Sequence, residues 1–133
     1  VYGINNIQPI WADHYFKTIE NAKMGLNLSR GEAIKYYSSD RITQIVGNGL
    51  VCLIDEKTQY RDFFNNKEMV FYKNTNDLSE KILKVSNDEK LRKTLGNNGK
   101  KKYMKYFNST LVAEFIINKT LGINNKKKFL WSK

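Results

Sequence analysis

The sequence predicts an α/β fold, in which helices flank a parallel sheet. Three short apolar segments of the kind that forms buried strands follow one another along the chain. Segments with the spacing of amphipathic helices lie between and after them. Strands joined by helical crossovers run parallel with right-handed connections, so an open parallel sheet is expected.

The strands are expected where apolar residues run almost without interruption. The clearest run, at 50–54, indicates a strand that is covered on both faces of the sheet. Runs at 23–29 and 69–72 predict two further strands, and 1–4 a fourth. The only cysteine of the chain, Cys52, lies inside the clearest run, so we expect a buried small hydrophobe rather than a catalytic thiol.

The helices are expected to begin at polar residues that can cap their first turn. Asp88 is expected to start a helix whose middle is weakened by Gly96 and Gly99. Leu111, Val112, Phe115 and Ile116 are expected to turn inward from the last helix, which Gly122 ends. The other expected N-caps are Asp13, Asp40, Asp77 (in a capping box with Glu80), and Asn108 or Ser109.

The size of the chain fits one domain. With 133 residues and 41% hydrophobic content, we expect a domain over residues 1–122 and a basic tail over 123–133. The sequence begins with Val1, so we expect a piece of a longer protein, with loss of an initiator Met or of a tag as the alternative. No segment approaches the roughly 20 apolar residues that span a bilayer. The single cysteine excludes a disulfide framework and fits the cytoplasm.

The net charge of +10 lies entirely in the second part of the chain. Residues 84–133 hold 13 Lys and Arg against 3 Asp and Glu. This asymmetry indicates either contact with nucleic acid or an anionic membrane, or solvated faces in a Lys-rich composition. Aromatic side chains among the lysines can stack on bases, but helical spacing of the first three favours the core. These aromatic residues are Tyr103, Tyr106, Phe107 and Trp131.

The loop after the first expected strand is the most polar part of the chain. In an open α/β sheet, anionic ligands bind where a strand ends and a helix begins. Arg41 falls in a first helical turn, where it opposes the helix dipole, so either a phosphate clamp or an ion pair with Asp40, Asp55 or Glu56 is expected. The candidate donors in this region are Asn27, Ser29, Arg30, Ser38, Ser39 and Arg41.

Several motifs with a known chemistry are absent from the sequence. There is no GxxxxGK[ST] phosphate loop, and Gly47 and Gly49 precede a strand, the reverse of a dinucleotide-binding fingerprint. His14 is the only histidine, so neither a Cys/His metal cluster nor a Ser-His-Asp triad is expected. No metal site and no catalytic base are therefore assigned.

Three segments together resemble a known family. They read GLNLSRGEAIKYYSSDRITQIVGNGLVCLIDEKTQYRDFF, EMVFYKNTNDLSEKI and NDEKLRKTLGNNGKKKYMKYFN. They resemble the C-terminal half of a GT-B glycosyltransferase, more narrowly the group 1 family and its spore-maturation-like relatives. The resemblance covers about residues 10–120 and implies a Rossmann-like domain that holds a nucleotide-sugar donor.

The resemblance also implies roles for the polar residues. Arg41 falls where the family has a loop arginine, and Ser38 and Ser39 before it suit contacts with the diphosphate. Gln44 falls where many relatives place a Glu that holds the donor ribose. The remaining implied residues are Asn27, Ser29 and Arg30 along the donor cleft, and Asp55 and Glu56 at its rim.

The expected function is transfer of a sugar from a nucleoside-diphosphate donor to an unknown glycan, lipid or protein acceptor. The resemblance implies that an N-terminal domain of the same protein supplies the acceptor contacts and that this chain alone is inactive. No cofactor is expected, because cations can stabilise the leaving nucleoside diphosphate. A cytoplasmic location is expected, with peripheral membrane contact. The alternative function is that of a basic nucleic-acid-binding module or of a non-catalytic interaction module.

Overall fold

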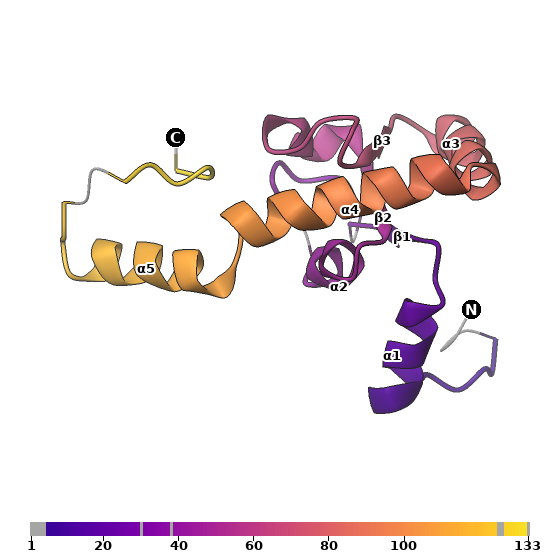
Figure 1. Cartoon of the computed structure of the whole chain (residues 1–133), viewed down its shortest axis with the longest axis horizontal. Coiled ribbons are helices and arrows are strands. Elements are labelled where there is room, and N and C mark those ends of the chain that lie inside the picture. The colour runs from indigo at the N-terminus through magenta and orange to yellow at the C-terminus, as the bar shows by residue number, and fades with distance from the viewer. Residues whose placement is uncertain (1–4, 30, 38, 125–126, 133) are drawn as a thin grey trace.

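The chain forms a three-stranded parallel sheet with the order β1-β2-β3. The computed structural model (Figure 1) describes residues 5–29, 31–37, 39–124 and 127–132. The strand expected at 1–4 therefore lies outside the described residues. The elements are α1 (Ala12–Glu20), β1 (Met24–Asn27), α2 (Arg41–Gly47), β2 (Val51–Asp55), the 3-10 turns η1 (Glu56–Thr58) and η2 (Tyr60–Asp62), β3 (Val70–Tyr72), α3 (Thr75–Asn87), α4 (Glu89–Tyr106) and α5 (Ser109–Thr120).

The α/β, Rossmann-like fold class is confirmed, and so are the three expected strands. The central strand β2 pairs on both sides, with Gly25 opposite Cys52 and Ile54 opposite Phe71. All of its first four residues are buried, which is the burial that its continuous apolar sequence predicts. Burial also raises the pKa of the Cys52 thiol to about 12, so this side chain is a core hydrophobe.

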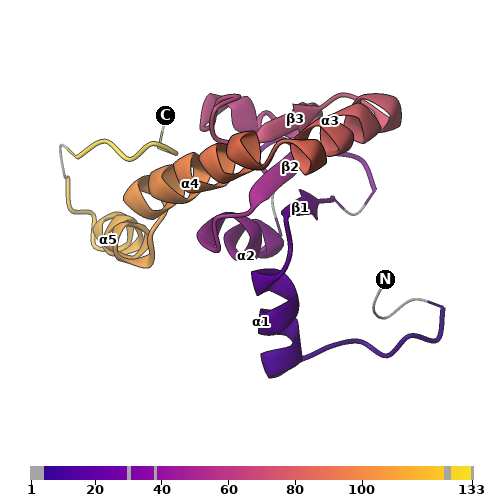
Figure 2. The ribbon, with the colours of Figure 1, turned by 45° about the vertical axis from the view of Figure 1, so that its right-hand side comes forward.

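Alternate residues of β2 face two separate hydrophobic clusters. Cys52 and Ile54 pack in a cluster with Val46 of α2 and with the segment between β2 and β3. Val51 points the other way and packs with Val85 of α3 and Leu95 of α4. The sheet is therefore covered on both faces, by α2 on one and by α3 with the start of α4 on the other (Figure 2).

Helix α4 crosses the amino edge of the sheet, where its two glycines allow close contact. A Cβ atom on Gly96 would lie 1.9 Å from the carbonyl oxygen of Gly49, just before β2. One on Gly99 would lie 2.6 Å from the carbonyl oxygen of Glu68, just before β3. Helix α4 is continuous through both glycines, so the expected weakening does not interrupt it, and the absence of a Cβ atom at each position allows the backbone contact.

Two of the expected N-caps are confirmed. Asp88 accepts a hydrogen bond from the amide of Leu91 at the start of α4. Asn108, rather than its alternative Ser109, accepts one from Leu111 at the start of α5.

Two further expected caps, Asp13 and Asp77, are wrong, and Asp40 is confirmed in its position only. Trp11 occupies the N-cap position of α1, so Asp13 lies inside its first turn. Asp40 occupies the N-cap position of α2, but its backbone is already helical and its side chain makes no cap hydrogen bond. In α3 the cap is Asn74, and Asp77 is the third helical residue, whose carboxylate accepts from the amide of Lys73.

The C-terminal helix α5 buries fewer of its apolar side chains than its sequence indicates. Val112 and Ile116 are 39% and 56% exposed, so their expected inward orientation is wrong. The reason is that α5 extends away from the sheet beyond the end of α4 (Figure 1), where little of the core can reach it. The half-buried Phe115 packs against Phe129 and Trp131 of the returning tail instead.

The aromatic residues of α4 contribute to the core. Tyr103 and Phe107 pack on the cluster that includes Phe64, and their rings are stacked with centroids 5.5 Å apart. The ring centroid of Trp131 lies 5.5 Å from that of Phe107. The helical spacing of Tyr103 and Phe107 therefore reflects their packing against the core. Among the described residues, no helix is long and apolar enough to cross a membrane.

Candidate ligand site at the carboxyl edge

The carboxyl edge of the sheet lies opposite the edge that α4 covers. Here β1 is followed by the loop 28–40 and β2 by the turns η1 and η2. The carboxyl ends of parallel strands share one edge, so the polar side chains that follow β1 and β2 are brought to the same end of the domain.

The end of β1 holds the start of α2 through two hydrogen bonds. Asn27, only 2% exposed, accepts through Oδ1 from the hydroxyl of Ser39 at 3.4 Å. The guanidinium of Arg41 donates from Nη1 to the carbonyl oxygen of Leu28 at 3.2 Å. The structure thus brings Ser39 and Arg41 to the end of β1, although each bonds to a residue 12 or more positions earlier in the chain.

Arg41 makes none of the expected ion pairs. No salt bridge between described residues includes it, so pairing with Asp40, Asp55 or Glu56 is wrong. The side chain is exposed and one bond to a carbonyl leaves its charge uncompensated by any described carboxylate. A guanidinium in this state can form further charge-assisted bonds with an anion.

The amide groups of α2 contribute less to anion binding than the sequence indicates. The amide of Ile42 donates to Ser39 O at 3.1 Å, and that of Thr43 to Asp40 O at 3.0 Å. The amide of Gln44 also donates to Asp40 O. Because these groups are already bonded within the first turn of a seven-residue helix, the positive charge of the site comes mainly from Arg41.

Tyr36 connects the loop after β1 to the turns after β2 through two hydrogen bonds. Its amide donates to Thr58 O at 2.8 Å, and its hydroxyl donates to the carboxylate of Asp62 at 2.5 Å. This hydrogen bond raises the pKa of the Tyr36 hydroxyl, since losing the proton would leave two facing anions. Sequence reasoning missed these residues; the buried Thr58, 1% exposed, carries no motif that identifies it.

The two carboxylates after β2 do not join this cluster. Asp55 accepts from the amide of Lys57 at 2.8 Å and so caps η1. Glu56 pairs with Arg61, with 3.0 Å between Oε1 and Nε, which directs it toward β3. Both side chains therefore stabilise the turns, and neither forms an ion pair with Arg41.

Two of the remaining expected residues, Gln44 and Ser29, lie near Arg41 and near the end of β1. Gln44 is half-buried on α2, one turn after Arg41 and on the same face. Ser29 is half-buried directly after β1. Arg30 and Ser38 lie outside the described residues. Within the described part of the chain there is no group of three or more side chains that could hold a metal ion.

These features define an α/β domain with a polar, cation-bearing carboxyl edge, which is the edge where open parallel sheets bind ligands. The family model described as glycosyl transferase-like matches residues 2–118. The chain therefore belongs to the glycosyl transferase-like family. Comparisons with curated proteins and with solved structures give no match.

Proposed function

We propose that this chain is the nucleotide-sugar donor-binding domain of a glycosyltransferase. It would form the C-terminal half of a GT-B enzyme related to the group 1 and spore-maturation-like enzymes. Membership of the glycosyl transferase-like family supports this proposal. The observation that carries it is Arg41, a cation at the carboxyl edge with no described carboxylate partner.

In this proposal Arg41 binds the diphosphate of the donor. Transfer leaves negative charge on the departing nucleoside diphosphate, and a positioned guanidinium stabilises that charge by two directed N–H bonds. Arg41 is positioned by its bond to Leu28 O, and Ser39 by its bond to Asn27. Arg30, Ser38 and Ser29 are further proposed contacts of the donor. No cofactor or metal is required by this scheme.

Gln44 is proposed to contact the donor ribose. It lies on the face of α2 that also carries Arg41, one turn further along the helix. A carboxamide oxygen can accept from a ribose hydroxyl, but only a carboxylate offers two equivalent acceptors. We therefore expect Gln44→Glu to bind the donor more tightly than the parent chain. A decrease in affinity would contradict the ribose assignment.

The acceptor is proposed to bind to an N-terminal domain of the same protein. This chain would then bind a donor without transferring its sugar. We keep a cytoplasmic location, with peripheral membrane contact, as part of the proposal. The proposed rim positions of Asp55 and Glu56 are the weakest assignments, because both carboxylates already bond within the turns.

A thermal-shift screen tests the donor proposal directly. The folded chain is heated with UDP, GDP, ADP, CMP and their sugar conjugates. A ligand at 100 times its dissociation constant adds about 2.7 kcal/mol of stability. We expect one nucleoside diphosphate to raise the melting temperature of the parent and not that of Arg41→Ala.

Arg92→Ala is the matched control. Arg92 also donates from Nη1 to backbone carbonyls, those of Val85 and Ser86, but it lies on α4 away from the carboxyl edge. Its variant should keep the ligand-induced shift even if the free protein is less stable. An equal shift in Arg41→Ala, or no shift with any nucleotide at millimolar concentration, overturns the proposal that this chain binds the donor through Arg41.

Nucleic-acid binding is the competing function. Of its four proposed stacking residues, Tyr103, Phe107 and Trp131 pack against the core, which leaves Tyr106 and the lysines to bind a nucleic acid. Binding through lysines would weaken steeply with added salt, whereas a nucleotide pocket loses much less. Titrating both ligands at two salt concentrations separates the two functions.

A further inference from the structure

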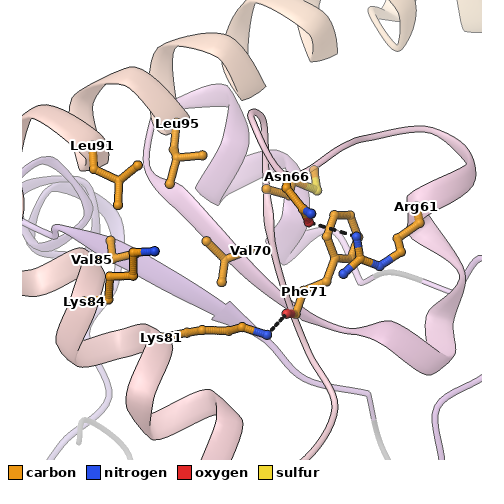
Figure 3. A pocket seen from close by; sticks show the side chains of 10 residues that line it. Arg61, Asn66, Val70, Phe71, Lys81, Lys84, Val85, Leu91 and Leu95 are labelled. Atoms are coloured by element: carbon orange, nitrogen blue, oxygen red, sulfur yellow. Dashed lines mark hydrogen bonds between the residues drawn. The ribbon is translucent and has the colours of Figure 1, made fainter.

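A second cavity lies along the outer edge of β3, outside the proposed donor site. It has a volume of about 290 Å³ and is lined by residues of η2, β3, α3 and α4. β3 is the last strand of the sheet, so one of its edges pairs with no strand among the described residues. Figure 3 shows the side chains that surround this edge.

The walls of the cavity are largely apolar. Val70 of β3, Val85 of α3, and Leu91 and Leu95 of α4 gather on one side of the strand (Figure 3). On the other side, the guanidinium carbon of Arg61 lies 4.4 Å from the centroid of the Phe71 ring. The cavity can therefore take an apolar body.

Three cations line the same cavity, and two of them are held in place. Arg61 bonds through Nε to Glu56 at 3.0 Å and through Nη1 to Asn66 at 2.8 Å. Lys81 bonds to Phe71 O and to the carboxylate of Asp77, both at 2.7 Å. Lys84 is exposed, and its amino group is turned toward Val70 in Figure 3.

The charges around the cavity do not cancel. Arg61 and Lys81 are matched by the carboxylates of Glu56 and Asp77, but no salt bridge between described residues includes Lys84. The positive charge of Lys84 therefore faces a largely apolar cavity, and a single anionic group would neutralise it.

An added peptide strand fits this edge poorly. The Phe71 carbonyl, which an added strand would need as an acceptor, already accepts from Lys81. Lysines that cover strand edges in this way oppose strand addition. A small molecule can occupy the cavity without breaking that bond.

We propose that this cavity binds a small organic monoanion with a rigid apolar body of about two aromatic rings. A cavity of roughly 150 Å³ accommodates benzene, and this one measures about 290 Å³. The anionic group lies beside Lys84, and the apolar body packs against Val70, Leu91 and Leu95. This site does not depend on the donor proposal.

Naphthoate is the probe that tests this site, with naphthalenemethanol as its neutral analogue. The binding of each to the 133-residue chain is followed through the NMR methyl signals of Val70, Val85, Leu91 and Leu95. We expect naphthoate to shift these signals saturably and the alcohol to bind about tenfold more weakly, a difference of about 1.4 kcal/mol. Inorganic phosphate, which has no apolar body, should not shift them.

Lys84→Gln tests the charge, and Lys101→Gln is its matched control. Both lysines are exposed and helical, but Lys101 does not line the cavity. We expect Lys84→Gln to weaken naphthoate about threefold or more and to leave the alcohol unchanged, while Lys101→Gln changes neither. Absence of saturable shifts, equal binding of the two probes, or insensitivity to Lys84→Gln would each overturn the proposal.

Discussion

The two edges of the sheet are built in opposite ways. At the amino edge, α4 lies so close to the backbone that Gly96 and Gly99 have no room for a Cβ atom. At the carboxyl edge, side chains and loops meet through hydrogen bonds of 2.5–3.4 Å. One edge therefore tolerates almost no change of side chain, whereas the other can change its polar residues while the sheet stays intact.

The largest expected effect breaks the amino edge. Gly96→Ala places a Cβ 1.9 Å from Gly49 O, so α4 must move away from β2. We expect a loss of about 3 kcal/mol in the free energy of unfolding, measured by urea titration. Gly47→Ala on α2 is the control: its Cβ would lie 3.8 Å from Met104 Cε, an ordinary contact. That variant should gain up to about 1 kcal/mol from helix propensity. Equal losses in the two variants would contradict the close-contact explanation.

A smaller effect is expected where the carboxyl edge depends on a buried amide. Asn27→Ala removes the 2%-exposed acceptor of the Ser39 hydroxyl. The expected cost is about 1–2 kcal/mol, because a hydrogen bond and buried contacts are lost together. A double-mutant cycle with Ser39→Ala isolates the bond itself. Fully additive losses would show that the 3.4 Å bond contributes nothing to the fold.

The start of α3 should give a weaker, pH-dependent effect. The hydrogen bonds from Lys81 and from the Lys73 amide lower the pKa of Asp77 below its ordinary 3.8. A lowered pKa in the folded state gives a stabilisation that is present above 3.8 and lost as the pH falls through the folded value. Asp77→Asn should therefore lower the melting temperature at neutral pH and flatten its decline in acid. Glu80→Gln, which removes an exposed carboxylate from the same helix, is the control. An unchanged acid slope in Asp77→Asn would contradict the assignment.

The smallest effect on stability is expected at Arg41. Its side chain is exposed and donates a hydrogen bond to Leu28 O at 3.2 Å. Arg41→Ala should change the free energy of unfolding by no more than about 0.5 kcal/mol. A loss comparable to that of Gly96→Ala would mean that this edge serves the fold as strongly as the amino edge does.

The strands could be predicted because a strand that is buried on both faces requires a continuous run of apolar residues, which is visible in the local sequence. The role of Gly96 could not, since its contact with Gly49 depends on how α4 crosses the sheet. Capping shows a second limit. The capping box expected at Asp77–Glu80 is not used, because α3 begins earlier, where Asn74 caps it shortly after the end of β3.

The candidate site was predictable to a similar extent. The positions of Asn27, Ser39 and Arg41 follow from the end of a strand and the start of a helix. The hydrogen bond from the Tyr36 amide to Thr58 O could not be predicted, because it joins two loops that share no sequence pattern. Helical spacing in α5 likewise could not reveal that Ile116 stays exposed, because this exposure depends on where α5 lies relative to the core.

The placement of the two tryptophans gives the chain a built-in optical reporter. Trp11, before α1, is 76% exposed, whereas Trp131 is held among Phe107, Phe115 and Phe129. Fluorescence from the first should resemble that of indole in water, and emission from the second should be shifted to shorter wavelength. Replacing Trp11 by Phe would leave Trp131 as the single tryptophan, whose emission follows the release of the C-terminal segment from α4.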